Sequence, residues 1–272
     1  MKMEILRSGF DTFDMAFQGA LPEKVLKTLE EGKDEAQATM KPTLVDLGPG
    51  RVAGHVLEGG KPGGYRYSFS TGPEGEIWFF KHNTDKGNWN IFVSVRSNQL
   101  VINGIEKVIE VLQERLVGFG AVVIAESVNR VDFAVDVVAS EFVLDPKRFV
   151  AHPHSVTRCH AEKDGKASED EFKPSVIWSG RTVTSVTIGK MPGRQIIVYD
   201  KRREAIKKKN LFMFDLWDID PKDKTKHVWR VEIRAGKRHL KDVWGISTVE
   251  DLLASACDVI GKALAVIRRT GR

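Results

Sequence analysis

The run Gln195-Ile-Ile-Val-Tyr-Asp-Lys-Arg-Arg-Glu204 changes from apolar to strongly basic within a few residues. Its β-branched first part predicts a buried strand, and a helix is expected from Glu204 onward. Tyr199, one of three tyrosines in the 272-residue chain, lies where this strand ends. A phenol that a strand holds beside cations is suited to attack a phosphodiester and keep the broken end as a phosphotyrosine ester. Tyr199 is therefore the candidate nucleophile; the alternative is a strand-end residue at the rim of a core.

Short strands and helices alternate on both sides of this run. Alternating apolar residues predict the strands, and apolar residues three or four positions apart predict the helices. The predicted strands are 65–70, 77–81, 89–95, 121–125, 130–138, 182–189, 194–200 and 228–235. The predicted helices are 21–35, 105–116, 204 onward and 248–268, and 152–171 is predicted to be a polar loop. This order predicts an α+β fold with a central, largely antiparallel sheet and helices on one face.

The sequence shows no obvious boundary between domains. A single domain over 1–272 is expected, because no linker or low-complexity segment separates its parts. The second half repeats the strand, strand, helix order of the first in outline, without the identity that would prove a duplication. Two related ββα-type halves, 1–120 and 121–272, therefore stay open as an organisation within that domain.

The composition is that of a soluble globular protein, with 42% hydrophobic and 29% charged residues. No apolar run approaches the roughly 18 residues that a membrane helix needs, and the N-terminus lacks the apolar stretch of a secretory signal. Cys159 and Cys257 are too few for a disulfide framework, so we expect two free thiols in a reducing compartment. The sequence thus predicts a cytoplasmic protein with no membrane partner.

Positive charge is concentrated directly after Tyr199. The net charge of the chain is only +5, but six cations fall within nine residues and are opposed only by Glu204. These cations are Lys201, Arg202, Arg203, Lys207, Lys208 and Lys209. Such a cluster favours a polyanion and predicts nucleic-acid binding that weakens with salt. A solvated basic helix face is the alternative interpretation.

Two predicted strands carry acidic residues on one face. Alternation along 130–136 places Asp132 and Asp136 together, and along 229–234 it places Glu232 between two arginines. If the strands share a sheet, these carboxylates could converge on Mg²⁺ or Mn²⁺, which prefer oxygen ligands. Nearby cations would then stabilise the phosphate oxygens. Ion pairs between each acid and a neighbouring arginine are the alternative. The candidate DNA contacts are Arg130, Lys190, Arg194, Arg202, Arg203, Arg230 and Arg234.

Four runs in order carry a family resemblance. They are Arg130-Val-Asp-Phe-Ala-Val-Asp136, Thr184-Ser-Val-Thr-Ile-Gly-Lys190, Ile197-Val-Tyr-Asp-Lys201 and Trp229-Arg-Val-Glu-Ile-Arg-Ala235. Their order and spacing resemble the replication initiation factor family, often called Rep_trans, over roughly residues 120–245. The early Gly9-Phe-Asp-Thr-Phe-Asp14 is similar to the opening strand of that family. The family includes rolling-circle plasmid initiators and relaxases of integrative conjugative elements.

The resemblance implies a metal-dependent tyrosine DNA endonuclease and strand transferase, that is, a nickase-ligase. Tyr199 matches the family's tyrosine, which attacks one strand at an origin and leaves a 5′-phosphotyrosyl link and a free 3′-hydroxyl. Lys201 would lie near the phosphate. The family's acidic ligands for Mg²⁺ or Mn²⁺ map best onto Asp132 and Glu232.

The resemblance leaves other parts of the site and its context open. Asp136 and Glu204 are further candidate ligands, while the chain has no His-hydrophobe-His pair on a strand, which argues against histidine ligation. The implied partner is origin DNA, as a double-strand origin, a hairpin or a single-stranded nick site, together with a helicase or other replication or mobilisation proteins. A homodimer and a monomer both stay open. The alternative function is a non-catalytic DNA-binding initiator or regulator on the same fold, with its carboxylates in ion pairs.

Overall fold

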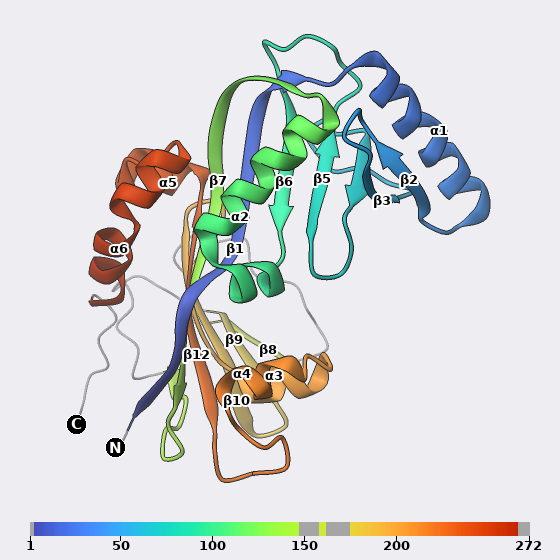
Figure 1. The fold of residues 1–272 in the computed structure, drawn as a ribbon. Helices are drawn as coiled ribbons and strands as arrows, with labels where there is room; N and C mark the ends of the chain where they lie inside the picture. Colours follow the sequence, from blue (N-terminus) through green and yellow to red (C-terminus); the bar gives the residue numbers. More distant parts are fainter. Residues whose placement is uncertain (1–2, 147–157, 162–174, 266–272) are drawn as a thin grey trace. The chain divides into compact units, whose positions relative to one another are not determined.

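The computed structural model describes residues 3–146, 158–161 and 175–265, where twelve strands and six helices occur (Figure 1). The strands are β1 (Glu4–Ala20), β2 (Thr43–Leu47), β3 (Val52–Val56), β4 (Tyr67–Ser70), β5 (Glu76–Phe80), β6 (Trp89–Val95), β7 (Val122–Val138), β8 (Arg158–Ala161), β9 (Ser175–Ser179), β10 (Thr182–Gly189), β11 (Arg194–Asp200) and β12 (Val228–Gly236). The helices are α1 (Glu23–Thr39), α2 (Ser97–Phe119), α3 (Lys201–Lys207), α4 (Phe212–Trp217), α5 (Lys237–Trp244) and α6 (Val249–Ala265).

The chain divides into two compact units. Unit 1 contains Met1–Gly9, Asp132–Trp244 and Ser255–Arg272. Unit 2 contains Phe10–Val131 and Gly245–Ala254. Both β1 and β7 contribute residues to each unit, because the division falls inside these two strands.

Unit 2 has an antiparallel sheet in the strand order β2-β3-β4-β5-β6-β1, followed by β7. Strand alternation buries Phe13, Trp78 and Phe80 on one face. Phe119 of α2 packs edge-on against Trp78, with ring centroids 5.1 Å apart. Helix α1 contacts β2 and β3 (Figure 1). Unit 2 therefore has a core of its own, made from aromatic side chains between a sheet and two helices.

In unit 1 the strand order of the sheet is β7, β12, β11, β10, β9 and β8. β12, β11, β10 and β9 pair antiparallel, whereas β8 joins β9 in parallel. One face of this sheet is apolar, and Val186, Val198 and Trp229 belong to its buried cluster. Tyr199 follows Val198 and therefore projects from the opposite face.

That opposite face is polar along its strands and covered by helices at one end. Arg230 is the β12 neighbour of Tyr199, and Val228 lies on the same face by alternation. Val228 packs in a second buried cluster with Phe214 and Trp217 of α4, and with Ala205 of α3. The helices after β11 thus cover the end of the sheet where Tyr199 lies.

The predicted α+β class with largely antiparallel strands is confirmed. The hairpin at 182–189 and 194–200 has the predicted bounds, and helix α1 lies within a few residues of its prediction. The segments 121–125 and 130–138, predicted as separate strands, form the single strand β7. Helix α2 begins at Ser97 rather than at 105, and Gly104 interrupts its backbone with a φ of 76°.

Other predicted boundaries changed or lie beyond the described residues. The polar loop predicted at 152–171 contains β8, and the rest of that stretch lies outside the described residues. The last three positions of the helix predicted at 248–268 lie outside them as well. Cys257 is a free, exposed thiol. In the part of the chain that the structure describes, the helices are too short or too polar to cross a membrane.

Candidate active site

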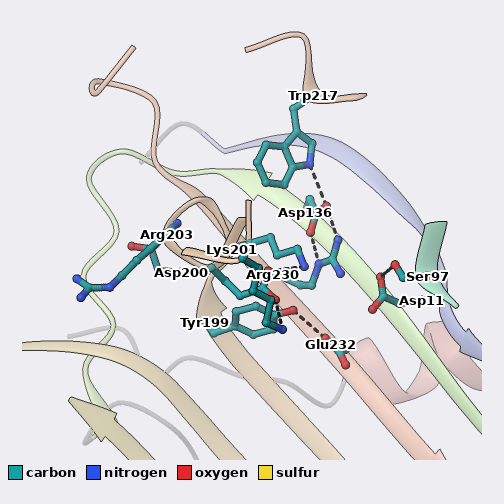
Figure 2. A network of polar contacts seen from close by, with 12 residues as sticks. Asp11, Ser97, Asp136, Tyr199, Asp200, Lys201, Arg203, Trp217, Arg230 and Glu232 are labelled. Atoms are coloured by element: carbon teal, nitrogen blue, oxygen red, sulfur yellow. Dashed lines mark hydrogen bonds and ion pairs between the residues drawn. The ribbon is translucent and has the colours of Figure 1, made fainter. Parts of the chain in front are cut away.

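Tyr199 lies near the end of an interior strand of unit 1. Its Cα pairs with Ser185 on β10 and with Arg230 on β12, so the main chain around it is fixed from both sides. The phenol is half-buried, and its hydroxyl donates a hydrogen bond of 3.0 Å to Glu232 Oε2 (Figure 2). Glu232 pairs with Ile197, so it is the diagonal cross-strand neighbour of Tyr199 on the same face. The predicted nucleophile and one predicted acid are therefore in direct contact.

Glu232 and Asp132 meet around one cation. Arg234 Nε lies 2.6 Å from Glu232 Oε1 and 3.6 Å from Asp132 Oδ2. Both carboxylates are buried, while the Arg234 side chain is 30% exposed. The two oxygens of Glu232 thus have different partners, the Tyr199 hydroxyl and the Arg234 guanidinium. The strand faces predicted to carry Asp132 and Glu232 do bring these two acids together.

Asp136 has a different environment. Arg230 binds it in bidentate fashion, with Nε 2.6 Å from Oδ1 and Nη2 2.9 Å from Oδ2. The indole Nε1 of Trp217 donates a third hydrogen bond of 3.0 Å to Oδ2 (Figure 2). Both side chains of the ion pair are 0% exposed. Charge-assisted bidentate bonds of this kind fix geometry as well as charge, so Asp136 holds Arg230 next to Tyr199.

Lys201 begins α3 two residues after Tyr199. It is buried, and its Nζ lies 2.7 Å from Glu204 Oε2 and 5.7 Å from the centroid of the Tyr199 ring. Burial alone would raise the pKa of Glu204, but the charge and hydrogen bonds of Lys201 and Lys208 outweigh it, and the pKa is lowered. Glu204 is therefore ionised at neutral pH and positions the ammonium group of Lys201 beneath the phenol.

Asp200 connects the strand to this helix. Its Oδ1 accepts a 2.8 Å hydrogen bond from the main-chain N–H of Arg203, which makes it the N-cap residue of α3. The cap fixes the turn between Tyr199 and Lys201. We expect Asp200→Ala to reduce the free energy of unfolding by about 1 kcal/mol.

Urea denaturation would measure that loss, with Asp200→Asn as the matched control because asparagine keeps the accepting oxygen and caps equally well. Equal losses for alanine and asparagine would contradict the capping role.

The predicted DNA-contacting cations have different environments. Arg230 and Arg202 are buried, and Arg202 Nη2 donates a hydrogen bond of 2.8 Å to the carbonyl oxygen of Pro221. Arg203 is exposed and bonds to the hydroxyl of Ser179. Lys190 and Arg194 are half-buried at the turn between β10 and β11, and Arg234 lies between the acids. Arg130 belongs to unit 2, where its charge acts on Asp14.

The acids fit a divalent cation in a limited way. Asp132 and Glu232 already hold one cationic group between them, and carboxylate oxygens are the ligands that Mg²⁺ and Mn²⁺ prefer. Within the described residues, no group of three or more His, Cys, Asp or Glu is arranged to hold a metal ion. Mg²⁺ commonly binds one or two carboxylates and takes its other ligands from substrate phosphates and water. The pair is consistent with that mode, provided that Arg234 moves aside.

Two residues near Tyr199 were not singled out in the sequence. Ser185 is its direct cross-strand neighbour on β10, and Trp217 completes the hydrogen bonding of Asp136. The alternation of β10 places Ser185 on a polar face, but only its register against β11 puts it beside Tyr199. Trp217 is 81 residues from Asp136 in the chain, so no local pattern indicates their contact.

Comparison with known proteins gave few matches. No protein-family model matches the chain, and no curated protein matches it. Among solved structures, the chain is similar to a rolling circle replication initiator protein from Geobacillus stearothermophilus, with 13% identity and a TM-score of 0.43. The match covers 100% of this chain and 89% of that chain. A likeness at this level carries no argument about the reaction.

Proposed function

We propose that the protein is a DNA nicking-closing enzyme that uses Tyr199 as its nucleophile. The observation that carries the proposal is the hydrogen bond of 3.0 Å from the Tyr199 hydroxyl to Glu232, whose partner Arg234 also contacts Asp132. A nucleophile in contact with a proton acceptor, which is itself oriented by a third group, is the arrangement that covalent catalysis needs. Here Arg234 orients Glu232.

The proposed reaction is a transesterification. The Tyr199 oxygen forms a bond to phosphorus, and the bond from phosphorus to the 3′-oxygen of the preceding nucleotide breaks. The phenolic proton passes to Glu232, and the departing 3′-oxygen takes up one proton from the solvent. No water is consumed, so attack by the 3′-hydroxyl reverses the step, closes the strand and returns the proton to Tyr199. The free 3′-end could instead prime DNA synthesis.

The chain supplies positive charge on the Tyr199 side of the site. Lys201 lies under the ring of Tyr199, and Arg234 is the most accessible cation in contact with the acids. Charge that accumulates on the non-bridging phosphate oxygens is stabilised by such preorganised cations. A divalent cation that takes the place of Arg234 between Asp132 and Glu232 would orient Glu232 instead and would polarise the scissile phosphate. Arg230 is buried in an ion pair with Asp136, so its role is in the sheet and not at the phosphate.

The biological setting that fits this chemistry is rolling-circle replication or conjugative mobilisation. Both need one strand to be cut at an origin while its ends stay available for synthesis or rejoining. The order of the four sequence runs around Tyr199 supports this setting, as does the local excess of cations after β11. The partner would be origin DNA, with the chain in the cytoplasm.

Formation of a covalent adduct tests the proposal. We expect a pool of random-sequence single-stranded oligonucleotides, labelled at the 3′-end, to become attached to the protein in Mg²⁺ or Mn²⁺ and to stay attached in denaturing electrophoresis. A 5′-labelled pool should leave no label on the protein, because the tyrosine retains the downstream fragment. Mass spectrometry of the digest should place the nucleotide on Tyr199.

Chelation and substitution test the metal contribution separately. We expect EDTA to abolish adduct formation, Mn²⁺ to restore it, and Asp132→Asn to raise the Mn²⁺ concentration needed by about tenfold or more, since one ligating charge is lost. Asp46→Asn, at an exposed ion pair with Arg51, is the matched control. Undiminished adduct formation in EDTA would rule out the metal requirement.

A second candidate function is DNA binding without cleavage. The contact of Arg234 with both acids favours it, because an ion-paired site needs no metal. This alternative predicts DNA affinity that chelators do not change and no adduct with either labelled pool. The labelling experiment therefore separates the two functions directly.

A further inference from the structure

A cavity of about 370 Å³ lies in unit 1, between the β10–β11 turn and α5. Its wall includes Lys190 from the turn, Arg194 from β11, and Arg238 and His239 from α5. Asp242 is the acidic side chain of this wall. The two guanidinium groups of this wall outnumber its one carboxylate, an excess of positive charge that favours an anionic ligand.

The guanidinium groups are available for that ligand. In the part of the chain that the structure describes, neither Arg194 nor Arg238 forms an ion pair, although Asp242 lines the same cavity. Both arginines are at least partly exposed. A guanidinium group presents several N–H donors in a plane and binds phosphate oxygens in bidentate fashion. Two such groups from different elements can hold one phosphate from two sides.

His239 lines the same cavity and has a ring nitrogen without a hydrogen-bond partner among the described residues. This nitrogen, Nε2, is buried. The ring is held edge-on to Trp244, with centroids 4.9 Å apart. Burial, and then the charge of Arg194, lower the pKa of His239, so the ring is neutral at pH 7. A neutral imidazole with its proton on Nε2 can donate to an anion without adding a further charge.

The cavity is separate from the proposed nicking site. Arg194 and Tyr199 are five residues apart on β11 and project from opposite faces of the sheet. At about 3.3 Å per residue, they are separated by roughly 17 Å along the strand.

We propose that this cavity is a phosphate-binding pocket that holds a backbone phosphate of the bound DNA, at a distance from the phosphate that Tyr199 attacks. The proposal rests on the proposed function for its ligand. The DNA strand would pass around the β10–β11 turn, where Lys190 lines the pocket. The pocket would anchor the strand, while the chemistry stays on the opposite face.

Inorganic phosphate tests the pocket without reference to nicking. We expect the imidazole signals of His239 in ¹H–¹⁵N spectra to move and saturate with phosphate at constant ionic strength, while those of His227, elsewhere in unit 1, stay in place. Sodium chloride at the same ionic strength should move neither. Arg238→Gln should weaken the phosphate response at least fivefold. A His239 signal that does not move, or that moves equally in chloride, overturns the pocket.

The salt dependence of DNA binding tests whether the phosphate belongs to DNA. We expect Arg238→Gln to lower the slope of log affinity against log salt by about 0.7 for a single-stranded oligonucleotide, because one phosphate contact is lost. Lys224→Gln, at an exposed position in unit 1, is the matched control and should leave the slope unchanged. An unchanged slope for Arg238→Gln, with phosphate binding intact, would show that the pocket takes a free phosphate compound instead and would overturn the DNA anchor.

The adduct rate keeps the two proposals distinguishable. Arg238→Gln should raise the DNA concentration that gives the half-maximal rate of adduct formation, because the pocket contributes one phosphate contact to DNA binding. If no adduct forms even in the wild type, while the His239 response and the salt slope behave as expected, the nicking function fails and the anchor stands. If the wild type forms the adduct but His239 does not respond to phosphate, the nicking function stands and the anchor fails.

Discussion

Tyr199→Phe is expected to lower the rate of covalent adduct formation by ~10⁴-fold or more while leaving DNA affinity within about twofold, because a nucleophile has been removed and no charge has changed. The substitution removes one oxygen, whose hydrogen bond to Glu232 is 3.0 Å long. The phenylalanine ring can keep the contact with Lys201, and Glu232 keeps its bond to Arg234. Loss of the hydrogen bond should cost only about 1 kcal/mol of stability. Binding is measured by fluorescence anisotropy and adduct formation by denaturing electrophoresis.

Tyr65→Phe provides the matched control. Tyr65 belongs to unit 2, where its ring packs against Phe92 and its hydroxyl lies 3.5 Å from the carbonyl oxygen of Trp89. The same oxygen is removed there, at a position with no acid beside it. Adduct formation by the Tyr65 variant should match the wild type. If the Tyr199 variant still forms an adduct, or if the loss equals that of Tyr65→Phe, Tyr199 is not the nucleophile.

The second large effect concerns stability. Arg230→Met is expected to lower the free energy of unfolding by about 3–5 kcal/mol, because it leaves the carboxylate of Asp136 buried without its counter-charge. Trp217 can still donate one hydrogen bond, but a single neutral donor does not replace a bidentate guanidinium group. Domains are typically stable by only about 5–15 kcal/mol, so the variant should unfold at much lower urea concentration.

Two further variants identify the cause of that loss. The double variant Arg230→Met/Asp136→Leu should recover most of the stability, since removal of both charges leaves no unpaired buried ion. Lys107→Met breaks an exposed ion pair with Glu110 and should cost less than about 1 kcal/mol. If the double variant is no more stable than Arg230→Met, the buried charge is not the cause. Adduct formation by the double variant also tests Asp136 as a metal ligand, because leucine cannot bind Mn²⁺.

The side-chain faces of unit 1 could be predicted because strand alternation is local. A period of two is enough to place Asp132 with Asp136, and Glu232 with its flanking arginines, on common faces. The antiparallel hairpin at 182–200 was also visible, since a Gly- and Pro-containing turn separates two β-branched runs. These features could be predicted because each depends on only a few consecutive residues.

The partners of those side chains could not be predicted, because they depend on register and on distant segments. The sequence gives no means to decide whether Asp136 or Asp132 faces Arg230, and the structure pairs Arg230 with Asp136. Arg230 was a candidate DNA contact by its charge, yet it is 0% exposed. Charge alone predicts a solvent-facing or DNA-facing arginine; burial depends on α3 and α4, which pack over this end of the face.

The secondary structure that was missed has short or atypical patterns. β2 and β3 each have five residues and flank a turn containing Gly48 and Gly50, so the stretch resembles a loop. α4 has six residues, too few for a helical period to be visible. α5 follows β12 directly, with only Gly236 at the junction, and its first residues are charged. In each case tertiary packing, rather than local propensity, stabilises the element.

The pairing of Tyr199 with strands on both sides has a topological consequence. On the proposed function, a Tyr199 that carries the end of a DNA strand could not swing with its main chain, because β10 and β12 pair with β11 on both sides. Superhelical tension in a nicked circle would therefore be released by rotation of the DNA about the intact strand, and not by a hinge in the protein. The attached 5′-end would stay in place throughout, and the swivel would belong to the nucleic acid.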